Sequence, residues 1–129
     1  MRFTATTDYA IRLMVEFADE KMLTAGELSD RTGISCFMVR NILRRLRYKG
    51  FLTSVRGVDG GYRLACSPTG TSVYDVMVAV ERTMEIVPSA EKAEGNKVRQ
   101  HYMQLQEEIH RLLKTVTLAD LKKSCAENA

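Results

Sequence analysis

The segment from Ser35 to Gly50 constrains the fold of this chain most strongly, because its apolar spacing and both of its ends indicate one helix. Its apolar residues recur at the i, i+3, i+4, i+7 spacing of a single helical face. They are Val39, Ile42, Leu43 and Leu46. Serine is favoured at a helix N-cap, and glycine is favoured just beyond a helix C-terminus. The sequence therefore predicts a helix with one face buried in a core.

The opposite face of this predicted helix is cationic and aromatic. Phe37, Arg44 and Tyr48 lie at its centre, and further arginines flank it. Guanidinium groups, side-chain amides and aromatic rings are groups that bind base edges and phosphates. The sequence thus predicts a DNA-recognition helix. The residues expected to contact DNA are Ser35, Phe37, Met38, Arg40, Asn41, Arg44, Arg45 and Tyr48.

A glycine-rich hairpin is predicted directly after this helix. Residues 51–56 and 62–66 are rich in β-branched and apolar residues, which favours two strands. The turn between them can adopt positive φ, has little side-chain bulk and is flanked by arginines. Glycines also form ordinary turns and exposed arginines are commonly only solvated, but helix and hairpin together favour a wing that enters the DNA minor groove. Its expected contacts are Arg56, Gly57, Gly60, Gly61 and Arg63.

Positive charge is concentrated around these two elements. The chain of 129 residues carries 19 Lys/Arg and 16 Asp/Glu, a net charge of +3. Eight of the basic residues but only one acid, Asp59, lie between Arg31 and Arg63, which leaves 11 basic and 15 acidic residues elsewhere. A basic module on a mildly acidic body indicates a polyanionic partner, here double-stranded DNA.

Length, hydropathy and cysteine content narrow the class of protein. A chain of this length fits one domain and needs no disulfide or metal to fold. It has no apolar run of the roughly 18–20 residues that cross a membrane, and its N-terminus lacks the apolar region of a signal peptide. Its three cysteines are scattered and odd in number. These features predict a cytoplasmic protein with no membrane partner and no disulfide framework.

Two helices are predicted before the recognition helix, at about 7–20 and from 23 or 24 to 32. Thr24 and Glu27 have the spacing of a capping box, and Gly33 ends the second helix. Helix, tight turn, helix and β-hairpin, in this order, make a winged helix-turn-helix. A short strand around Thr24 that pairs with the wing is an alternative for the start of the second helix.

Beyond the wing, a helix capped by Ser72 or Thr71 is predicted to reach about residue 82. The longest predicted helix, 96–115, has apolar residues at 4-3-4-3-4 spacing, the pattern of a heptad seam that packs against another helix. They are Val98, Tyr102, Leu105, Ile109, Leu112 and Val116. This stripe could instead cover its own domain, but the N-terminal helices already use their apolar faces on each other. We therefore expect a homodimer joined through this seam.

The predicted fold class is mainly α with a small β-hairpin wing. A winged helix-turn-helix DNA-binding domain is expected at 1–82 and a surface loop at 83–96. A long C-terminal dimerisation helix follows at 97–129, together with a short last helix that Thr117 and Asp120 cap and a frayed tail from Ser124.

Three stretches of this sequence resemble the Rrf-two family of bacterial winged-helix transcription regulators. They are MRFTATTDYAIRLMVEFA at the N-terminus, GIS…ILRRLRYKGFLTSVRG…GGYRLA in the middle, and TVTLADL near the end. The family includes the iron–sulfur cluster regulator, nitric-oxide sensors and the cysteine-metabolism repressor. The resemblance covers nearly the whole chain and implies a homodimer that binds a roughly palindromic operator, most simply as a repressor.

The sequence departs from this family in ways that bear on function. Members with an iron–sulfur cluster hold it with three cysteines in the loop before the long helix, and this loop has none here. We therefore expect no cofactor, and in particular no cluster of the usual family type. Thr6, Thr7 and Asp8 stand where many members have a phosphate-binding Lys-Gly-Arg run, and Arg40 stands where a glutamate is common. The operators of relatives are therefore not carried over to this chain.

Two further hypotheses concern chemistry and partners. Cys36 begins the recognition helix, where the helix dipole favours a thiolate, so it is a candidate redox sensor as well as an ordinary small residue. No nucleophile–base pair, phosphate loop or carboxylate pair indicates an enzyme. A winged-helix module that binds only proteins is the alternative function, although unpaired arginines are uncommon at the centre of a protein interface.

Overall fold

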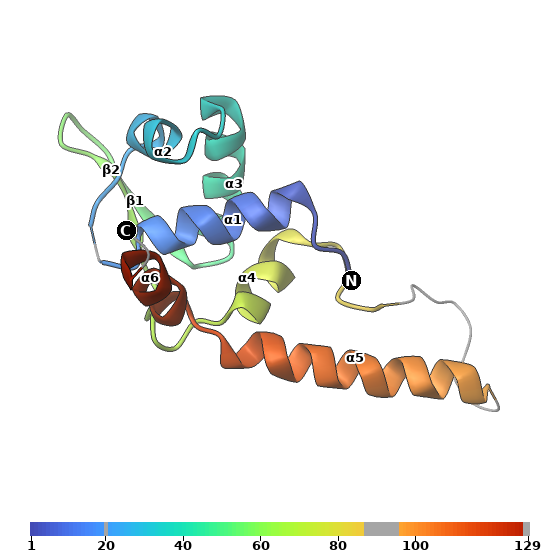
Figure 1. The fold of residues 1–129 in the computed structure, drawn as a ribbon. Coiled ribbons are helices and arrows are strands. Elements are labelled where there is room, and N and C mark those ends of the chain that lie inside the picture. Colours follow the sequence, from blue (N-terminus) through green and yellow to red (C-terminus); the bar gives the residue numbers. More distant parts are fainter. Residues whose placement is uncertain (20, 87–95, 128–129) are drawn as a thin grey trace.

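The computed structural model describes residues 1–19, 21–86 and 96–127, arranged as a helical body with a β-hairpin and a long helical arm (Figure 1). The elements in chain order are α1 (Ala5–Glu16), α2 (Ala25–Thr32), α3 (Cys36–Tyr48), β1 (Leu52–Val55), β2 (Gly61–Leu64), α4 (Val73–Val80), α5 (Lys97–Thr115) and α6 (Leu118–Glu127). The predicted fold class, mainly α with one small hairpin, is confirmed. The loop expected at 83–96 falls largely on residues 87–95, outside the described part.

The core of the body is built on the inner face of α3. All four predicted apolar residues of this helix, Val39, Ile42, Leu43 and Leu46, are at most 1% exposed. They pack with Leu13 and Met14 of α1, with Phe17 just after α1, and with Leu28 of α2 and Val76 of α4. The spacing of apolar residues therefore fixes which face of α3 points inward, and hence which face points to solvent.

The helix ends follow from local hydrogen bonds. The Thr4 side chain accepts from the Thr7 backbone N–H, so α1 starts two residues before its predicted start at residue 7. It ends at Glu16, four residues earlier than predicted, because the Phe17 N–H bonds to Met14 and tightens the last turn. Conversely, the tail expected to fray from Ser124 stays helical to Glu127.

The start of α2 combines both sequence-based alternatives. Thr24 is its N-cap and forms a capping box with Glu27, and Gly33 ends the helix with φ of 74°. The residue before it, Leu23, pairs with Tyr62 of the wing through two backbone hydrogen bonds of 2.9 and 2.8 Å. The helix and the strand pairing thus share the stretch around Thr24 and attach the wing to the body.

The far end of the chain is joined to α4 by short backbone contacts. Ser72 caps α4 in a capping box, and Val73 donates its N–H to the carbonyl of Val116 at 2.9 Å. Thr117 and Asp120 make the predicted cap of α6, and the Thr117 backbone N–H holds the pKa of Asp120 below its usual value. The C-terminal end of α5 is therefore fixed beside the start of α4.

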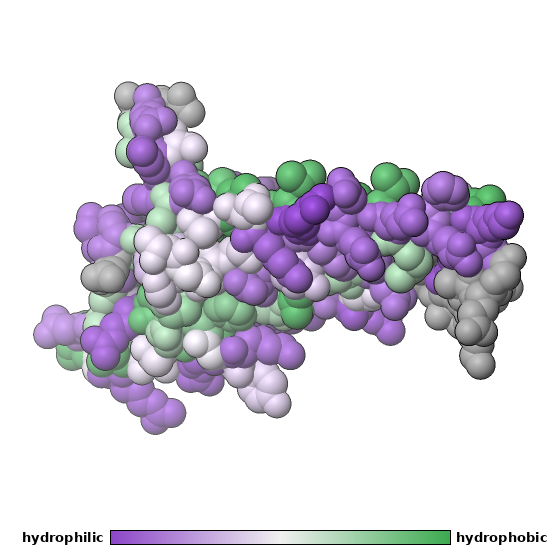
Figure 2. Space-filling view, turned by 90° about the horizontal axis from the view of Figure 1, so that it is seen from below, coloured by the Kyte–Doolittle hydropathy of each residue, from purple (hydrophilic) through white to green (hydrophobic). Residues whose placement is uncertain are grey.

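The long helix α5 lies below the other helices in Figure 1 and extends beyond them as an arm. Of its 19 residues only Gln106 is buried. In Figure 2, hydrophobic side chains are spaced along one edge of this arm. None of the helices that the structure describes is long and apolar enough to cross a membrane.

The packing of α3 yields a stability prediction. Leu43→Ala removes a fully buried side chain from the centre of the core and should lower the free energy of unfolding by about 2–5 kcal/mol. Val58→Ala is a matched control, because Val58 is fully exposed and its loss should change stability by less than about 0.5 kcal/mol. Urea unfolding at one protein concentration measures both variants. Equal stability of the two would mean that the inner face of α3 is not packed.

Candidate nucleic-acid interface

The outer face of α3 presents large side chains that the fold leaves in solvent. Phe37 is 73% exposed and Tyr48 is 86% exposed, and Arg40 and Arg44 are exposed between them. Asn41 is half-buried at the edge of this face. The Ser35 hydroxyl accepts from the Met38 backbone N–H at 3.3 Å, so its proton can still be donated to a ligand. We call this surface (Ser35, Phe37, Arg40, Asn41, Arg44 and Tyr48) the recognition face.

Four arginines of α3 and the hairpin are left without a partner among the residues that the structure describes. Within the described residues, Arg40 and Arg44 of α3 and Arg56 and Arg63 of the hairpin make no ion pair and no side-chain hydrogen bond. By contrast, Arg12 and Arg31 elsewhere in the body pair with acids. Four guanidinium groups that no described carboxylate pairs with give the recognition face and the hairpin a positive charge, which attracts a polyanion.

Two residues expected to contact DNA are used by the fold. Met38 is half-buried and packs against the hydrophobic core. The Arg45 guanidinium donates to the carbonyl of Val80, at the C-terminal end of α4, at 3.4 Å. Both side chains lie at the edge of α3 that faces the other helices, because 100° per residue places them away from Phe37 and Arg44. Both side chains are thus partly engaged within the fold, and their contact with DNA stays a prediction.

Arg47 has a role that the sequence did not indicate. Its guanidinium donates to the Ser54 hydroxyl of β1 at 3.1 Å, so it connects α3 directly to the hairpin. Its place in the sequence, among four arginines of one helix, does not single it out. Only the position of β1 beside that edge of α3 makes it a link between recognition face and wing.

The hairpin is a two-stranded antiparallel sheet in which Leu52 pairs with Leu64 and Val55 with Gly61. The tip beyond the strands is open: Gly57 has φ of 116°, a Cβ added there would have nothing within 4 Å, and Val58 is fully exposed. Arg56 and Arg63 are exposed beside this tip. The predicted wing therefore has the shape and charge expected of an element that enters a groove.

Gly60 and Gly61 are required by the hairpin itself. A Cβ at Gly60 would lie 2.2 Å from the backbone oxygen of Val55, and one at Gly61 would lie 2.9 Å from the backbone oxygen of Leu23. Gly61 also has φ of 156°. These close contacts inside the chain explain both glycines. Their presence is therefore no evidence for a close approach to DNA, and the exposed tip carries that expectation alone.

The residues present do not fit an iron–sulfur cluster. Cys36, Cys66 and Cys125 are free thiols on α3, after β2 and on α6, and the loop between α4 and α5 contains no cysteine in the sequence. Among the described residues, no three His, Cys, Asp or Glu side chains come together as metal ligands. Cys36 is half-buried at the first position of α3, and its redox role stays a prediction.

The second candidate surface is the seam of α5. Leu105 and Leu112 are 56% and 65% exposed, and Val98, Tyr102 and Val116 are exposed as well, whereas Ile109 is half-buried. Val116 lies just beyond the end of the helix, at its C-cap. Nothing in the described chain covers this stripe. The alternative, that the stripe packs against its own domain, is therefore not seen in this structure. The stripe fits a partner helix.

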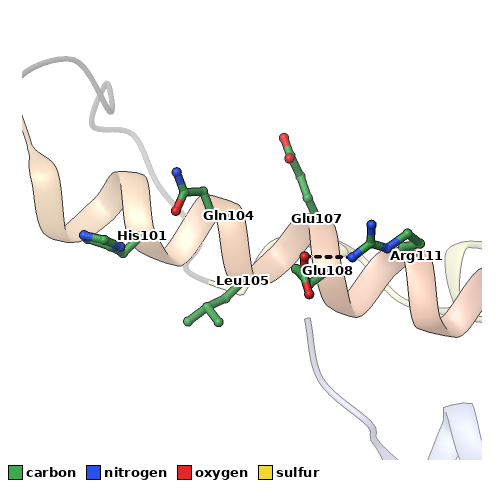
Figure 3. A pocket seen from close by; sticks show the side chains of 6 residues that line it. All are labelled: His101, Gln104, Leu105, Glu107, Glu108 and Arg111. Atoms are coloured by element: carbon green, nitrogen blue, oxygen red, sulfur yellow. Dashed lines mark hydrogen bonds and ion pairs between the residues drawn. The ribbon is translucent and has the colours of Figure 1, made fainter.

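A shallow hollow of about 690 Å³ borders this seam (Figure 3). Leu105 is its apolar residue, and its other lining residues are His101, Gln104, Glu107, Glu108 and Arg111. Glu108 and Arg111 form an ion pair at 2.7 Å along the helix. Polar and charged residues beside an apolar seam are usual at the edge of a protein–protein interface.

A different face of α5 holds the segment that follows α4. Gln106 accepts the backbone N–H of Ile86 at 2.7 Å, and His110 Nε2 lies 2.7 Å from the carbonyl oxygen of Met84. His110 also packs edge-on against Tyr74 of α4, with ring centroids 5.0 Å apart. The sequence did not indicate these contacts, and His110 accordingly serves the fold and not a metal.

Comparison with known proteins identifies the family. Residues 3–124 match the model of the Rrf2 family, whose description is iron-dependent transcriptional regulator. The chain belongs to the Rrf2 family. It is 31% identical to the HTH-type transcriptional regulator IscR of Yersinia pseudotuberculosis, over 94% of this chain and 79% of that protein. It is 29% identical to protein rrf2 of Nitratidesulfovibrio vulgaris, over 100% of this chain and 94% of that protein.

Solved structures of two regulators have the same fold. CymR, the global cysteine regulator of B. subtilis, superposes with a TM-score of 0.84 at 22% identity, covering 96% of this chain and 98% of CymR. IscR of T. potens gives a TM-score of 0.82 at 24% identity, covering 99% of this chain and 90% of IscR. The resemblance read from the sequence is thus confirmed. The chain is a winged-helix, DNA-binding transcriptional regulator, and by its family it is not an enzyme.

Proposed function

We propose that this Rrf2 protein is a cytoplasmic repressor that binds a palindromic operator as a homodimer, without an iron–sulfur cluster of the usual family type. The observation that supports this most is the recognition face, where Arg40 and Arg44 are exposed and, like Arg56 and Arg63, have no partner within the described part of the chain. A dimer that occupies a promoter excludes polymerase, so repression is the simplest outcome of binding.

Arg40 is the residue proposed to read a base. It lies one turn after the N-cap Ser35, and recognition helices enter the major groove with their N-terminal residues at base edges. A guanidinium offers two donors suited to O6 and N7 of guanine. Arg44 lies one turn further along and is proposed to bind phosphate. Each half-site should therefore have a guanine opposite Arg40.

The first test compares these two arginines. Arg40→Ala should relax base preference at one symmetric position of the operator by about 1–3 kcal/mol. Arg44→Ala is the matched control and should weaken binding to all sequences about equally. Selection of bound duplexes from a random pool measures both. A uniform loss of affinity for Arg40→Ala, with every base preference kept, would show that Arg40 only binds phosphate.

The second test concerns the wing. Arg56 is exposed beside the open tip and is proposed to neutralise one phosphate at the minor groove. Arg56→Ala should then reduce the slope of log K against log salt by about 0.9, since one fewer counterion is released. Lys123→Ala removes an exposed cation from α6 and should leave the slope unchanged. Equal slopes for the wild-type protein and Arg56→Ala would place the wing away from the phosphates.

Dimerisation through α5 is proposed because the seam is apolar, continuous and uncovered in the single chain. The helix is about 28 Å long at 1.5 Å per residue, which gives two antiparallel copies a long contact. The polar rim beside Leu105 provides groups that can pair across the contact or remain hydrated. Val98, Tyr102, Leu105, Ile109, Leu112 and Val116 are the proposed interface residues.

The third test breaks the seam. Leu105→Glu places a carboxylate at an exposed position of the single chain, so the monomer should fold normally. In a dimer this charge would be buried at a cost of several kcal/mol, and dimer affinity should fall by at least roughly 100-fold. Gln104→Glu adds the same charge on the adjacent rim and should change dimerisation little. Sedimentation at micromolar concentration that leaves Leu105→Glu fully dimeric would exclude this interface.

A further inference from the structure

A groove lies between the C-terminal ends of α3 and α4, beside the recognition face. Its cavity measures about 440 Å³. Val78 and Ala79 of α4 form its apolar floor, and Val78 is 48% exposed there. A second cavity of about 350 Å³ shares Val78 and Ala79 and continues toward Phe51 and Tyr74. We call the two together the α3–α4 groove.

One end of this groove is strongly cationic. Arg44, Arg45 and Lys49 line it from the α3 side, and Arg82 lines it from just beyond α4. Arg45 donates to a backbone carbonyl, and among the described residues the other three cations have neither an ion pair nor a hydrogen bond from their side chains. The groove therefore combines an apolar floor with a positive end that the fold leaves uncompensated.

Among the described residues, Glu81 is the one acid that lines the cationic cavity, and its carboxylate is already hydrogen-bonded elsewhere. Its carboxylate accepts hydrogen bonds from the hydroxyls of Thr4, at 2.5 Å, and Thr7, at the start of α1. Asp75, at the far end of the groove, is likewise occupied, because it accepts the backbone N–H of Ser72 in the α4 cap. Neither carboxylate is directed at the cations of the groove.

We propose that the α3–α4 groove binds a small organic anion, a carboxylate or sulfonate on an aromatic or branched aliphatic body. Guanidinium groups bind such anions through paired hydrogen bonds, and the floor around Val78 would cover the apolar body. Cavities of this size are typical of small-molecule sites. A DNA phosphate would bring no apolar group to Val78 and Tyr74, and a second protein copy would bury unpaired cations at the centre of its interface.

This site has a regulatory consequence that rests on the proposed function. Arg44 and Tyr48 belong both to the groove and to the recognition face. An anion bound in the groove would pair with Arg44 and neutralise charge beside the DNA. Binding of the anion should therefore weaken binding of the operator, and by linkage the operator should weaken binding of the anion by the same factor.

The test uses naphthoate as the anion and naphthalenemethanol as its uncharged counterpart, titrated into the free protein and followed by backbone amide NMR. Naphthoate should shift the amides of residues 48–51 and 74–82 saturably, and the alcohol should bind roughly tenfold or more weakly. The double variant Lys49→Ala/Arg82→Ala should weaken naphthoate binding by a similar factor. Lys97→Ala/Lys123→Ala, which removes two exposed cations from α5 and α6, is the matched control and should bind as the wild type does.

Several outcomes would overturn the site. They are equal binding of acid and alcohol, shifts confined to the α5 seam, or unchanged naphthoate binding by Lys49→Ala/Arg82→Ala. Val78→Asp gives an independent check, because it places a carboxylate on the exposed floor without disturbing the core, and it should abolish naphthoate binding. Retained binding by this variant would also reject the groove.

A second arm separates the site from its regulatory role. Saturating naphthoate should raise the Kd for a selected duplex several-fold in the wild type, and this effect should vanish in Lys49→Ala/Arg82→Ala. If naphthoate binds in the groove but DNA affinity is unchanged, the anion site stands and the proposed competition between anion and operator is rejected. Failure of the chain to bind any duplex would reject the proposed function. The titration of the free protein would still show whether the groove binds naphthoate.

Discussion

Burial of the inner face of α3 is the interaction on which the rest of the structure depends. Four apolar side chains of this helix fill the centre of the core, and α1, α2 and α4 all pack around them. Because a helix that buries one face must expose the other, this packing also orients Phe37, Arg44 and Tyr48 toward solvent. One face of these thirteen residues thus stabilises the fold, and the proposed recognition of DNA belongs to the opposite face, which can vary without loss of the core.

Most of the fold could be predicted because its signals are local. The capping boxes at Thr24 and Ser72, the glycine after α2 and the 4-3-4-3-4 spacing in α5 each depend on residues a few positions apart. Helix ends were less predictable: α1 stops at Glu16 because of a tightened last turn, which no residue type there requires. The wing was predicted, but its main-chain attachment at Leu23 was only one of two alternatives.

The candidate site was harder to predict, because it depends on partners far away in the sequence. Arg45 and Arg44 are adjacent and chemically identical, yet only Arg45 is engaged by Val80, 35 residues later. Arg47 is distinguished only by its contact with Ser54 across the hairpin. Gly60 and Gly61 suggested an open approach to DNA, whereas backbone oxygens of Val55 and Leu23 already occupy the space beside them. In each case the sequence shows the residue type, but only the structure shows which distant residue lies next to it.

The attachment of α4 to α5 has a consequence for how the regulator responds to its own abundance. At the start of α4, Val73 is hydrogen-bonded to Val116 at the end of α5. The segment that follows α4 contacts His110 and Gln106 in the middle of α5. The chain on both sides of α4 is therefore attached to α5. In a dimer joined through α5, the distance between the two α3 helices is then set by the same helix that brings the copies together. On the proposed palindromic operator, a lone chain would match only one half-site, and full discrimination would arise only once two chains associate. Occupancy of an operator would therefore rise with the square of chain concentration at low abundance, giving a sharper threshold than a monomeric repressor could produce.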